Sequence, residues 1–396
     1  MIRRGLLISV VTAALLLAAV TAAQADNRQT FRAGPVKVVT QNLYIGGDIL
    51  LPLSVPPEQF PAAAAEVIQQ LLATNYPERA MKLSELIREE QPHLIGLQEV
   101  YHVKICLDIE QDICLLDQDY LEILLDNLNQ GWAGYREVAT VTNIDLQNLP
   151  ASLPDDTPIF VSITDRDVVL AHRFVRTENP VADNFQTSLP VDNPLLPGFS
   201  VIRGYAMVDA FVLGREYRFV NTHLEVAAAG SPLEPFFRAV QTGQALELVA
   251  LLQQDDHVQI VVGDFNSDPF DGPFNPCAAP GGQCPTPYAI MSGANLFGAV
   301  YIDTWLERRG PFSLGNTCCQ ATLLDNVVSQ LDERVDLVWV RQASDYYGPR
   351  FIRTVRAKVI GEEQRDKTTT SIAAPNGLWP SDHAGVSTRM ILRSPK

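Results

Sequence analysis

Five short segments of this 396-residue chain place polar side chains at the end of an apolar, strand-like run. They are Thr40-Gln41-Asn42, Leu97-Gln98-Glu99, Asn221-Thr222-His223-Leu224-Glu225, Gly263-Asp264-Phe265-Asn266 and Ser381-Asp382-His383, and a sixth, Arg334-Val335-Asp336, begins a strand. In α/β proteins, side chains at strand ends commonly meet in one crevice. We therefore expect these residues to lie together.

The residue types in these segments favour a hard divalent cation together with a phosphate group. Carboxylate and amide oxygens, completed by water, are the ligands that Mg²⁺ or Mn²⁺ accepts most readily. Imidazoles can stabilise charge on phosphoryl oxygens, and a carboxylate can orient or deprotonate a water. Each residue alone is more often a turn, a cap or a surface group, so the prediction depends on their joint occurrence in this order.

Strand-like and helix-like segments alternate along the chain, which indicates an α/β architecture. We expect strands over 36–41, 94–99, 205–213, 217–221, 258–262, 335–340 and 385–391, and helices over 77–90 and 237–252. The chain shows no internal repeat and no clear linker. We expect one domain over residues 26–396.

The first 25 residues have the pattern of a signal peptide. Arg3 and Arg4 precede an uncharged stretch, and Ala23-Gln24-Ala25 is the small-x-small pattern that favours cleavage before Asp26. Cleavage would take the formal net charge from −16 to −18. No later stretch is long and apolar enough for a transmembrane helix. We expect a secreted or periplasmic monomer.

The excess of acidic residues and the number of cysteines further restrict the possible classes of function. Thirty basic against 46 acidic residues argue against a protein that holds nucleic acid by non-specific charge. Six cysteines suit an oxidising compartment. We expect local disulfides in the couples Cys106–Cys114 and Cys277–Cys284. We expect Cys318 or Cys319 to reach a distant partner, because disulfide geometry disfavours a bond between neighbours, and the full connectivity stays open.

The ordered segments resemble the endonuclease/exonuclease/phosphatase superfamily, which includes DNase I-like nucleases, inositol polyphosphate phosphatases and neutral sphingomyelinases. The strongest motifs are Asn-Thr-His-Leu at 221–224, Gly-Asp-Phe-Asn at 263–266 and Ser-Asp-His at 381–383. The Thr317–Gln320 segment is similar to an exported bacterial branch. The resemblance implies two packed β-sheets flanked by helices, the four-layer DNase I-like sandwich.

The resemblance also implies a metal site of oxygen ligands. Glu99 would be the main ligand of Mg²⁺ or Mn²⁺, with Asn42 beside it and Asp382 contributing through water. Two residues after Asn42 the chain has Tyr44, where repair endonucleases often carry an aspartate. This departure weakens the case for a second metal ion and for a repair endonuclease.

The remaining motif residues would carry the chemistry. By resemblance, Asp264 would position or activate the attacking water, and Asn266 would hold the phosphate or the leaving oxygen. His223 and His383 would contact the phosphoryl oxygens, and Asp336 would hydrogen-bond His383. The identity of the general base, Asp264 or His383, stays open. Arg173 and Arg203 are weaker candidates for a further phosphate contact, since both are more simply explained as surface ion pairs.

The expected activity is a metal-dependent phosphodiesterase, and its substrate stays open between nucleic acid and a phospholipid headgroup. The Ala- and Leu-rich stretch 61–73 lies between Asn42 and Glu99 and is either a hydrophobic lid or a helix packed on the core. Residues 99–126 hold eight acids and one base, Lys104, and would repel a long polyanion if they bordered the cleft. A non-catalytic exported binding protein on the same scaffold is the competing class.

Overall fold

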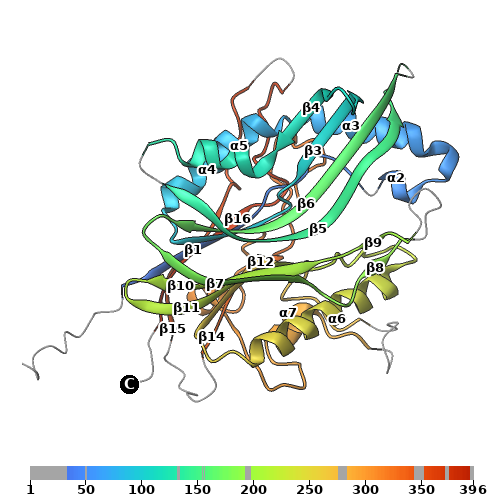
Figure 1. The fold of residues 1–396 in the computed structure, drawn as a ribbon. Helices are drawn as coiled ribbons and strands as arrows, with labels where there is room; N and C mark the ends of the chain where they lie inside the picture. The colour runs from blue at the N-terminus through green and yellow to red at the C-terminus, as the bar shows by residue number, and fades with distance from the viewer. Residues whose placement is uncertain are drawn as a thin grey trace, which may run out of the picture. The chain divides into compact units, whose positions relative to one another are not determined.

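The strand-forming segments pair into two mixed β-sheets in the computed structural model of the chain (Figure 1). The structure describes residues 34–392 except 50, 132–133, 154, 156, 192–197, 275–282, 343–351 and 371–373. The expected signal peptide, residues 1–25, therefore lies outside the described residues. The described helices and strands belong to the unit that begins at Pro35.

The first sheet has the strand order β15-β16-β1-β2-β6-β3-β4, with β5 paired to β6. Its strands are β1 (Val36–Asn42), β2 (Leu94–Gln98), β3 (His102–Asp108), β4 (Ile113–Asp119), β5 (Tyr135–Ser152), β6 (Pro158–His172), β15 (Ile352–Ile360) and β16 (Gly385–Leu392). Strands β1 and β2 run parallel, with Asn42 opposite Gln98. Asn42 and Glu99 are therefore delivered at the same edge of this sheet.

The second sheet has the order β13-β14-β12-β11-β10-β7. Its strands are β7 (Arg176–Asn184), β10 (Gly204–Val212), β11 (Arg215–His223), β12 (Gln259–Asp264), β13 (Ile302–Asp303) and β14 (Asp336–Arg341). Strands β11 and β12 are parallel with His223 opposite Asp264, and β12 and β14 are antiparallel with Asp264 opposite Asp336. This register aligns three motif residues across one edge. A short pair, β8 (Leu189–Pro190) and β9 (Ser200–Val201), stands apart.

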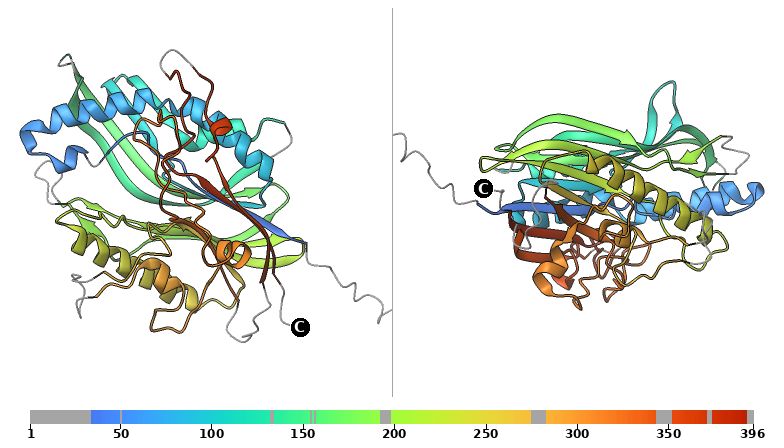
Figure 2. Two further views of the ribbon diagram at one scale, coloured as in Figure 1. Left: turned by 180° about the vertical axis from the view of Figure 1, so that it is seen from behind. Right: turned by 90° about the horizontal axis from the view of Figure 1, so that it is seen from below.

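Helices cover the outer faces of both sheets (Figures 1 and 2). The described helices are α2 (Leu51–Ser54), α3 (Phe60–Ala73), α4 (Tyr76–Glu90), α5 (Tyr120–Leu128), α6 (Glu234–Gln253), α7 (Pro287–Met291) and α8 (Thr304–Arg309), with 3₁₀ turns at Pro57–Gln59 and Gln364–Asp366. Helices α3, α4 and α5 share an apolar cluster with the first sheet, and α6 and α7 share one with the second. Helix α4 buries Leu83, Leu86 and Ile87, the stripe that its sequence period predicts.

A third apolar cluster fills the space between the sheets. Val38 and Val169 of the first sheet and Phe219 and Val262 of the second are fully buried there. Helices, sheet, sheet and helices thus form four layers, and the predicted fold of two packed sheets flanked by helices is confirmed. No helix among the described residues is long and apolar enough to cross a membrane.

The cysteine predictions meet different outcomes. The expected Cys106–Cys114 disulfide is present and joins neighbouring strands β3 and β4. Cys277 lies outside the described residues, so its expected bond stays a prediction. The expectation that Cys318 or Cys319 reaches a distant partner is wrong, because the structure joins them to each other. The peptide bond between them is cis, and their Cα atoms lie 3.1 Å apart, closer than the spacing of about 5.5 Å on which the expectation rested.

Candidate active site

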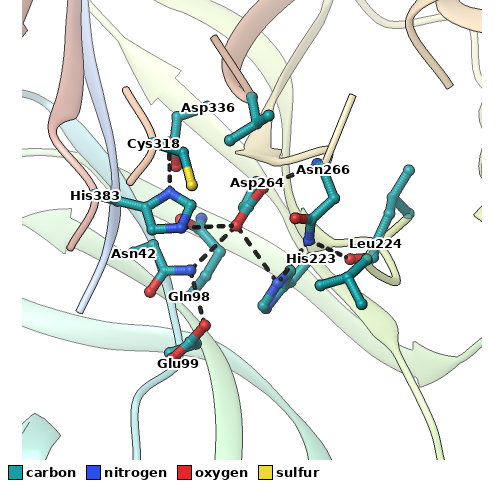
Figure 3. Close-up of polar contacts among 12 residues, drawn as sticks. Asn42, Gln98, Glu99, His223, Leu224, Asp264, Asn266, Cys318, Asp336 and His383 are labelled. Carbon is teal, nitrogen blue, oxygen red and sulfur yellow. Dashed lines mark hydrogen bonds and ion pairs between the residues drawn. The ribbon is translucent and has the colours of Figure 1, made fainter. Parts of the chain in front are cut away.

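The Asp264 carboxylate lies at the centre of the residues brought together by the strand ends (Figure 3). Its Oδ2 atom is 3.5 Å from His223 Nε2 and 3.8 Å from His383 Nε2. Oδ2 also accepts a hydrogen bond of 3.1 Å from Asn42 Nδ2, and Oδ1 accepts one of 2.9 Å from the Asn266 backbone. Burial raises the pKa of Asp264 above its usual value, against the opposing effect of His383.

His383 is held by a second carboxylate, Asp336. The ring nitrogen Nδ1 lies 2.8 Å from Asp336 Oδ2, which leaves Nε2 directed at Asp264. Burial by itself lowers the pKa of His383, but the charges of Asp336, Asp264 and Asp382 outweigh it and raise this pKa well above the usual range. His383 is therefore an imidazolium that presents an N–H to the centre of the site.

His223 has the opposite surroundings. The Arg203 guanidinium, which can only donate, lies 3.0 Å from His223 Nδ1. This contact makes Nδ1 the acceptor and puts the ring proton on Nε2, which faces Asp264. Burial, followed by the charges of Arg203 and His383, holds the pKa of His223 well below its usual value. His223 is therefore a neutral donor.

Asn266 is placed by backbone geometry that its sequence motif does not reveal. The backbone of Asn266 has a positive φ of 47°. The side-chain Nδ2 atom donates to the Leu224 carbonyl at 2.9 Å and lies 3.2 Å from His223 Nε2. Asparagine tolerates this left-handed conformation better than most residues. The amide is thereby fixed beside the imidazole.

Three oxygen-bearing residues expected to bind a metal ion lie on the other side of Asp264. Glu99 Oε1 accepts from Asn42 Nδ2 at 3.0 Å, and its Oε2 accepts from the Ile45 backbone at 3.2 Å. Burial raises the pKa of Asp382 to about 7, and Glu99 adds to the rise. Two carboxylates that raise each other's energy in one cleft lining suit a hard cation, which would relieve their repulsion.

Asn42 is oriented differently from the expectation. Its Oδ1 atom accepts from the Tyr44 backbone at 2.9 Å, and its Nδ2 atom faces both Glu99 and Asp264. The amide N–H₂, not the carbonyl oxygen, is therefore turned toward the carboxylates. In this arrangement Asn42 links Glu99 to Asp264.

A cleft of about 280 Å³ lies at the side of the site that carries Glu99 and Asp382. Glu99, Asp382 and Arg203 line it, together with Tyr44 and Tyr101. Within the acidic stretch 99–126, only Glu99 and Tyr101 are among the described lining residues. The condition under which this stretch would repel a long polyanion, that it borders the cleft, is therefore met only by Glu99 among its acids.

The two arginines considered as further phosphate contacts lie in different surroundings. Arg203 was a weak candidate, yet it contacts His223 and lies 3.5 Å from Glu225 at the cleft. Arg173 is exposed and stacks on Phe174, so it is not part of the cluster. Cys319 Sγ lies 3.8 Å from His383 Nε2. The signal for Arg203 was its position directly before β10, the strand that pairs with the Asn-Thr-His-Leu strand.

Residues 125–383 match the sequence model described as the Endonuclease/Exonuclease/phosphatase family. The chain belongs to this family. The endonuclease/exonuclease/phosphatase match contains both histidines and the carboxylates of Asp264, Asp336 and Asp382, whereas Asn42 and Glu99 precede it. The structure brings these two residues to the same centre through β1 and β2.

Solved structures share the endonuclease/exonuclease/phosphatase fold at low identity. A family protein from Bacteroides thetaiotaomicron is 13% identical, with 92% of this chain and 100% of that chain covered and a TM-score of 0.51. The mannosyl-6-phosphatase of Bacteroides thetaiotaomicron VPI-5482 is 14% identical, with 90% and 100% covered and a TM-score of 0.50. A family protein from Beutenbergia cavernae is 16% identical, with 91% and 72% covered and a TM-score of 0.49. No curated protein sequence matches the chain.

Proposed function

We propose that this chain is an exported, divalent-metal-dependent phosphodiesterase that hydrolyses its ester by in-line attack of water. One observation carries the proposal: the Asp264 carboxylate lies between two imidazoles that their neighbours hold in different proton states. A phosphoryl group has negative oxygens to be neutralised and a water to be oriented. The cluster offers donors for the first task and a carboxylate for the second.

The chain's own residues divide the work by their geometry. Asp264 accepts the proton of the attacking water, because it is the acceptor that both imidazoles and Asn42 surround. His383 cannot take that role readily, since its Nδ1 is bound to Asp336 and its Nε2 already carries a proton. His383 and His223 donate to phosphoryl oxygens, and Asn266 holds the phosphate or the leaving oxygen. The ester bond then breaks on the side opposite to the water.

The metal ion would be held by Glu99, with Asp382 contributing through water, and Asn42 would keep the Glu99 carboxylate in place. The donor chemistry of these residues fits Mg²⁺ or Mn²⁺. When bound, such an ion supplies positive charge that lowers the energy of the developing phosphoryl anion.

Further observations support parts of the proposal. The solved neighbour with a phosphatase name acts, by that name, on a mannosyl 6-phosphate, so cleavage of a monoester is an alternative that the assays must include. Export is supported by the signal-like pattern at residues 1–25 and by the Cys106–Cys114 disulfide, which suits an oxidising compartment.

The proposal is tested with purified protein, Mg²⁺ or Mn²⁺, and a panel of plasmid DNA, RNA, sphingomyelin, inositol phosphates and a simple aryl phosphodiester. We expect hydrolysis that a chelator abolishes and added metal restores. Asp264→Asn should lower kcat by roughly 10²–10⁴-fold, the usual contribution of a general base. Asp183→Asn, an exposed aspartate of β7, is the matched control and should keep wild-type activity.

Two outcomes would count against the proposal. Equal activity of Asp264→Asn and the control would refute the assigned base. Metal binding without turnover of any substrate would favour the non-catalytic binding protein. Among active outcomes, nicked plasmid alone would identify a nuclease, and released phosphocholine alone would identify a phospholipid phosphodiesterase.

A further inference from the structure

An apolar groove lies beside the cleft, between helix α3 and the β5–β6 hairpin. Figure 2 shows α3 running alongside these long strands. Phe60 and Ala64 of α3 form one wall, Leu146 and Leu149 of β5 form the other, and Phe199 adds to the lining. Every described lining side chain is apolar. We call this feature the apolar groove.

The groove follows the seam between two separate apolar clusters. Val67, Ile68 and Leu71 on one face of α3 belong to the cluster of the first sheet. Ile144 and Val201 belong to a different, smaller cluster. Because Ala64 is small, the two clusters do not close against each other at this point. Of the two alternatives predicted for the stretch 61–73, the helix packed on the core is therefore present. The same helix also lines the apolar groove.

The groove has room for a ligand chain. It holds about 100 Å³ of space, and one water-sized group needs roughly 10–15 Å³ of such space. A methylene group is close to water in size, so a run of several methylenes fits. Apolar surface left without a partner in this form is typical of a binding site.

The groove is continuous with the cleft of the active site. Ile49, Ile144 and Val201 line both of them. The cleft end carries the carboxylates of Asp48, Glu99, Glu225 and Asp382 and the guanidinium of Arg203, whereas the groove end carries no charged side chain among its described lining residues. A ligand that spans both must therefore be charged at one end and apolar at the other.

We propose that the substrate is an amphiphilic phosphate ester whose alkyl or acyl chain lies in the apolar groove while its phosphate lies beside Asp264. This inference rests on the proposed function, since it assigns a substrate class to the same site. A nucleic acid base placed in this groove would leave its polar edges without hydrogen-bond partners, because every described lining side chain is apolar. A chain of methylenes gains from every carbon that it buries.

The test uses p-nitrophenyl alkyl phosphodiesters, from methyl to octyl, below the concentrations at which they aggregate and with Mg²⁺ present. For the wild type we expect kcat/KM to rise about fourfold per methylene until the groove is full. Ala64→Trp should fill the groove and flatten the series while leaving the rate for the methyl ester unchanged. Ala62→Trp, the same change at an exposed position of the same helix, should retain the wild-type slope.

A second variant and a binding measurement cover the cases in which the first readout fails. Leu149→Asn puts an amide into the groove at a half-buried position and should flatten the series in the same way if Ala64→Trp does not fold. Calorimetric binding of butyl phosphate and octyl phosphate, compared with inorganic phosphate, reports on the groove without turnover. Tightening with chain length in the wild type and not in the variant supports the inference.

The outcomes separate this inference from the proposed function. Hydrolysis of the methyl ester with a flat series overturns the inference and leaves the phosphodiesterase standing, all the more so if plasmid DNA is cleaved. No hydrolysis of any ester, with binding that tightens along the series, contradicts the proposed function and supports the groove. Binding that ignores chain length overturns the inference in either case.

Discussion

At the scale of single residues, the site depends on neighbours that hold two histidines in different proton states. Asp336 contacts His383 at 2.8 Å and favours its cation, whereas Arg203 contacts His223 at 3.0 Å and favours its neutral form. The same residue type thus presents an N–H to the Asp264 centre in both cases, once with a charge and once without. The neighbours, more than the histidines themselves, set the chemistry.

Arg203 provides a test at this scale, because it acts through His223 as a positioning residue. Arg203→Gln removes the donor to Nδ1, so we expect kcat/KM to fall roughly 10–100-fold as the ring loses its fixed orientation. Since the Arg203 charge lowers the pKa of His223, the variant should also protonate His223 at a higher pH. The acidic limb of the kcat/KM profile should therefore move to higher pH.

The pH profile separates positioning from general damage to the fold. Arg173→Gln is the matched control, since Arg173 is an exposed arginine that stacks on Phe174. It should leave both the rate and the profile unchanged. A lower rate for Arg203→Gln with an unshifted acidic limb would show that Arg203 does not act through the protonation of His223.

The candidate residues could be predicted from the sequence because each one directly follows or begins an apolar strand, and parallel neighbours end at the same edge. The roles of their partners could not. Arg203 is separated by 20 residues from the histidine that it contacts, and only the β10–β11 pairing brings the two together. The Cys318–Cys319 bond likewise depends on a local backbone geometry that residue types do not specify.

At the scale of elements, the side chain of Asn221 connects the two sheets beside the site by hydrogen bonds. Asn221 of β11 donates to the Leu97 carbonyl at 2.8 Å and to the Val168 carbonyl at 3.1 Å, and its Oδ1 accepts from Gln98 at 2.5 Å. These partners lie on β2 and β6 of the other sheet. Since Gln98 precedes Glu99, the contact also fixes the position of Glu99 relative to His223.

We expect Asn221→Leu to lower the free energy of unfolding by about 2–4 kcal/mol, because it removes the hydrogen bonds to two buried carbonyls and leaves the Gln98 amide with Thr40 as its remaining partner. Denaturant unfolding measures the change. Asn127→Leu is the control, since that amide donates to the Ile123 carbonyl one turn earlier in its own helix, and it should cost about 1 kcal/mol or less. Equal losses in the two variants would contradict the bridging role of Asn221.

The elements that could be predicted from the sequence are those with uninterrupted apolar runs, such as β2, β12 and β14. The long β5–β6 hairpin could not, because its apolar alternation is broken by register shifts in β5 and by Asp165-Arg166-Asp167 in β6. Its pairing is decided by tertiary contacts, which propensity does not report. For the same reason, the apolar groove beside this hairpin could not be predicted from the sequence.

At the scale of the whole molecule, the acidic surplus is partly organised into local pairs. Lys104 lies 3.2 Å from Asp112 and 3.3 Å from Asp117, and Arg166 lies 2.8 Å from Asp119. These contacts belong to the β3–β4 hairpin and its surroundings, away from the cleft lining. These paired acids therefore do not border the cleft.

Other acids are buried within the fold, and they make its stability depend on pH. Asp165 of β6 is fully buried, and burial, assisted by Glu99 and opposed by Arg203, raises its pKa to about 7. An unfolded aspartate has a pKa of about 3.9. Below this pH Asp165 is protonated in both the folded and the unfolded state, so its burial as a charge does not lower the free energy of unfolding. As the pH rises from about 4 to 7, only the unfolded state releases the proton, so the folded protein loses stability relative to the unfolded chain.

Asp165→Asn should abolish this loss because the amide does not titrate. We expect the free energy of unfolding of the variant, relative to wild type, to increase between pH 4.5 and pH 8 by on the order of 2–4 kcal/mol, the amount that a shift of this size allows. Denaturant unfolding at several pH values measures it. Asp145→Asn, an exposed aspartate of the neighbouring β5, should run parallel to wild type. If Asp165→Asn also ran parallel, the buried carboxyl would be ionised throughout, and its contact with Arg203 at 3.8 Å would be a true ion pair within the fold.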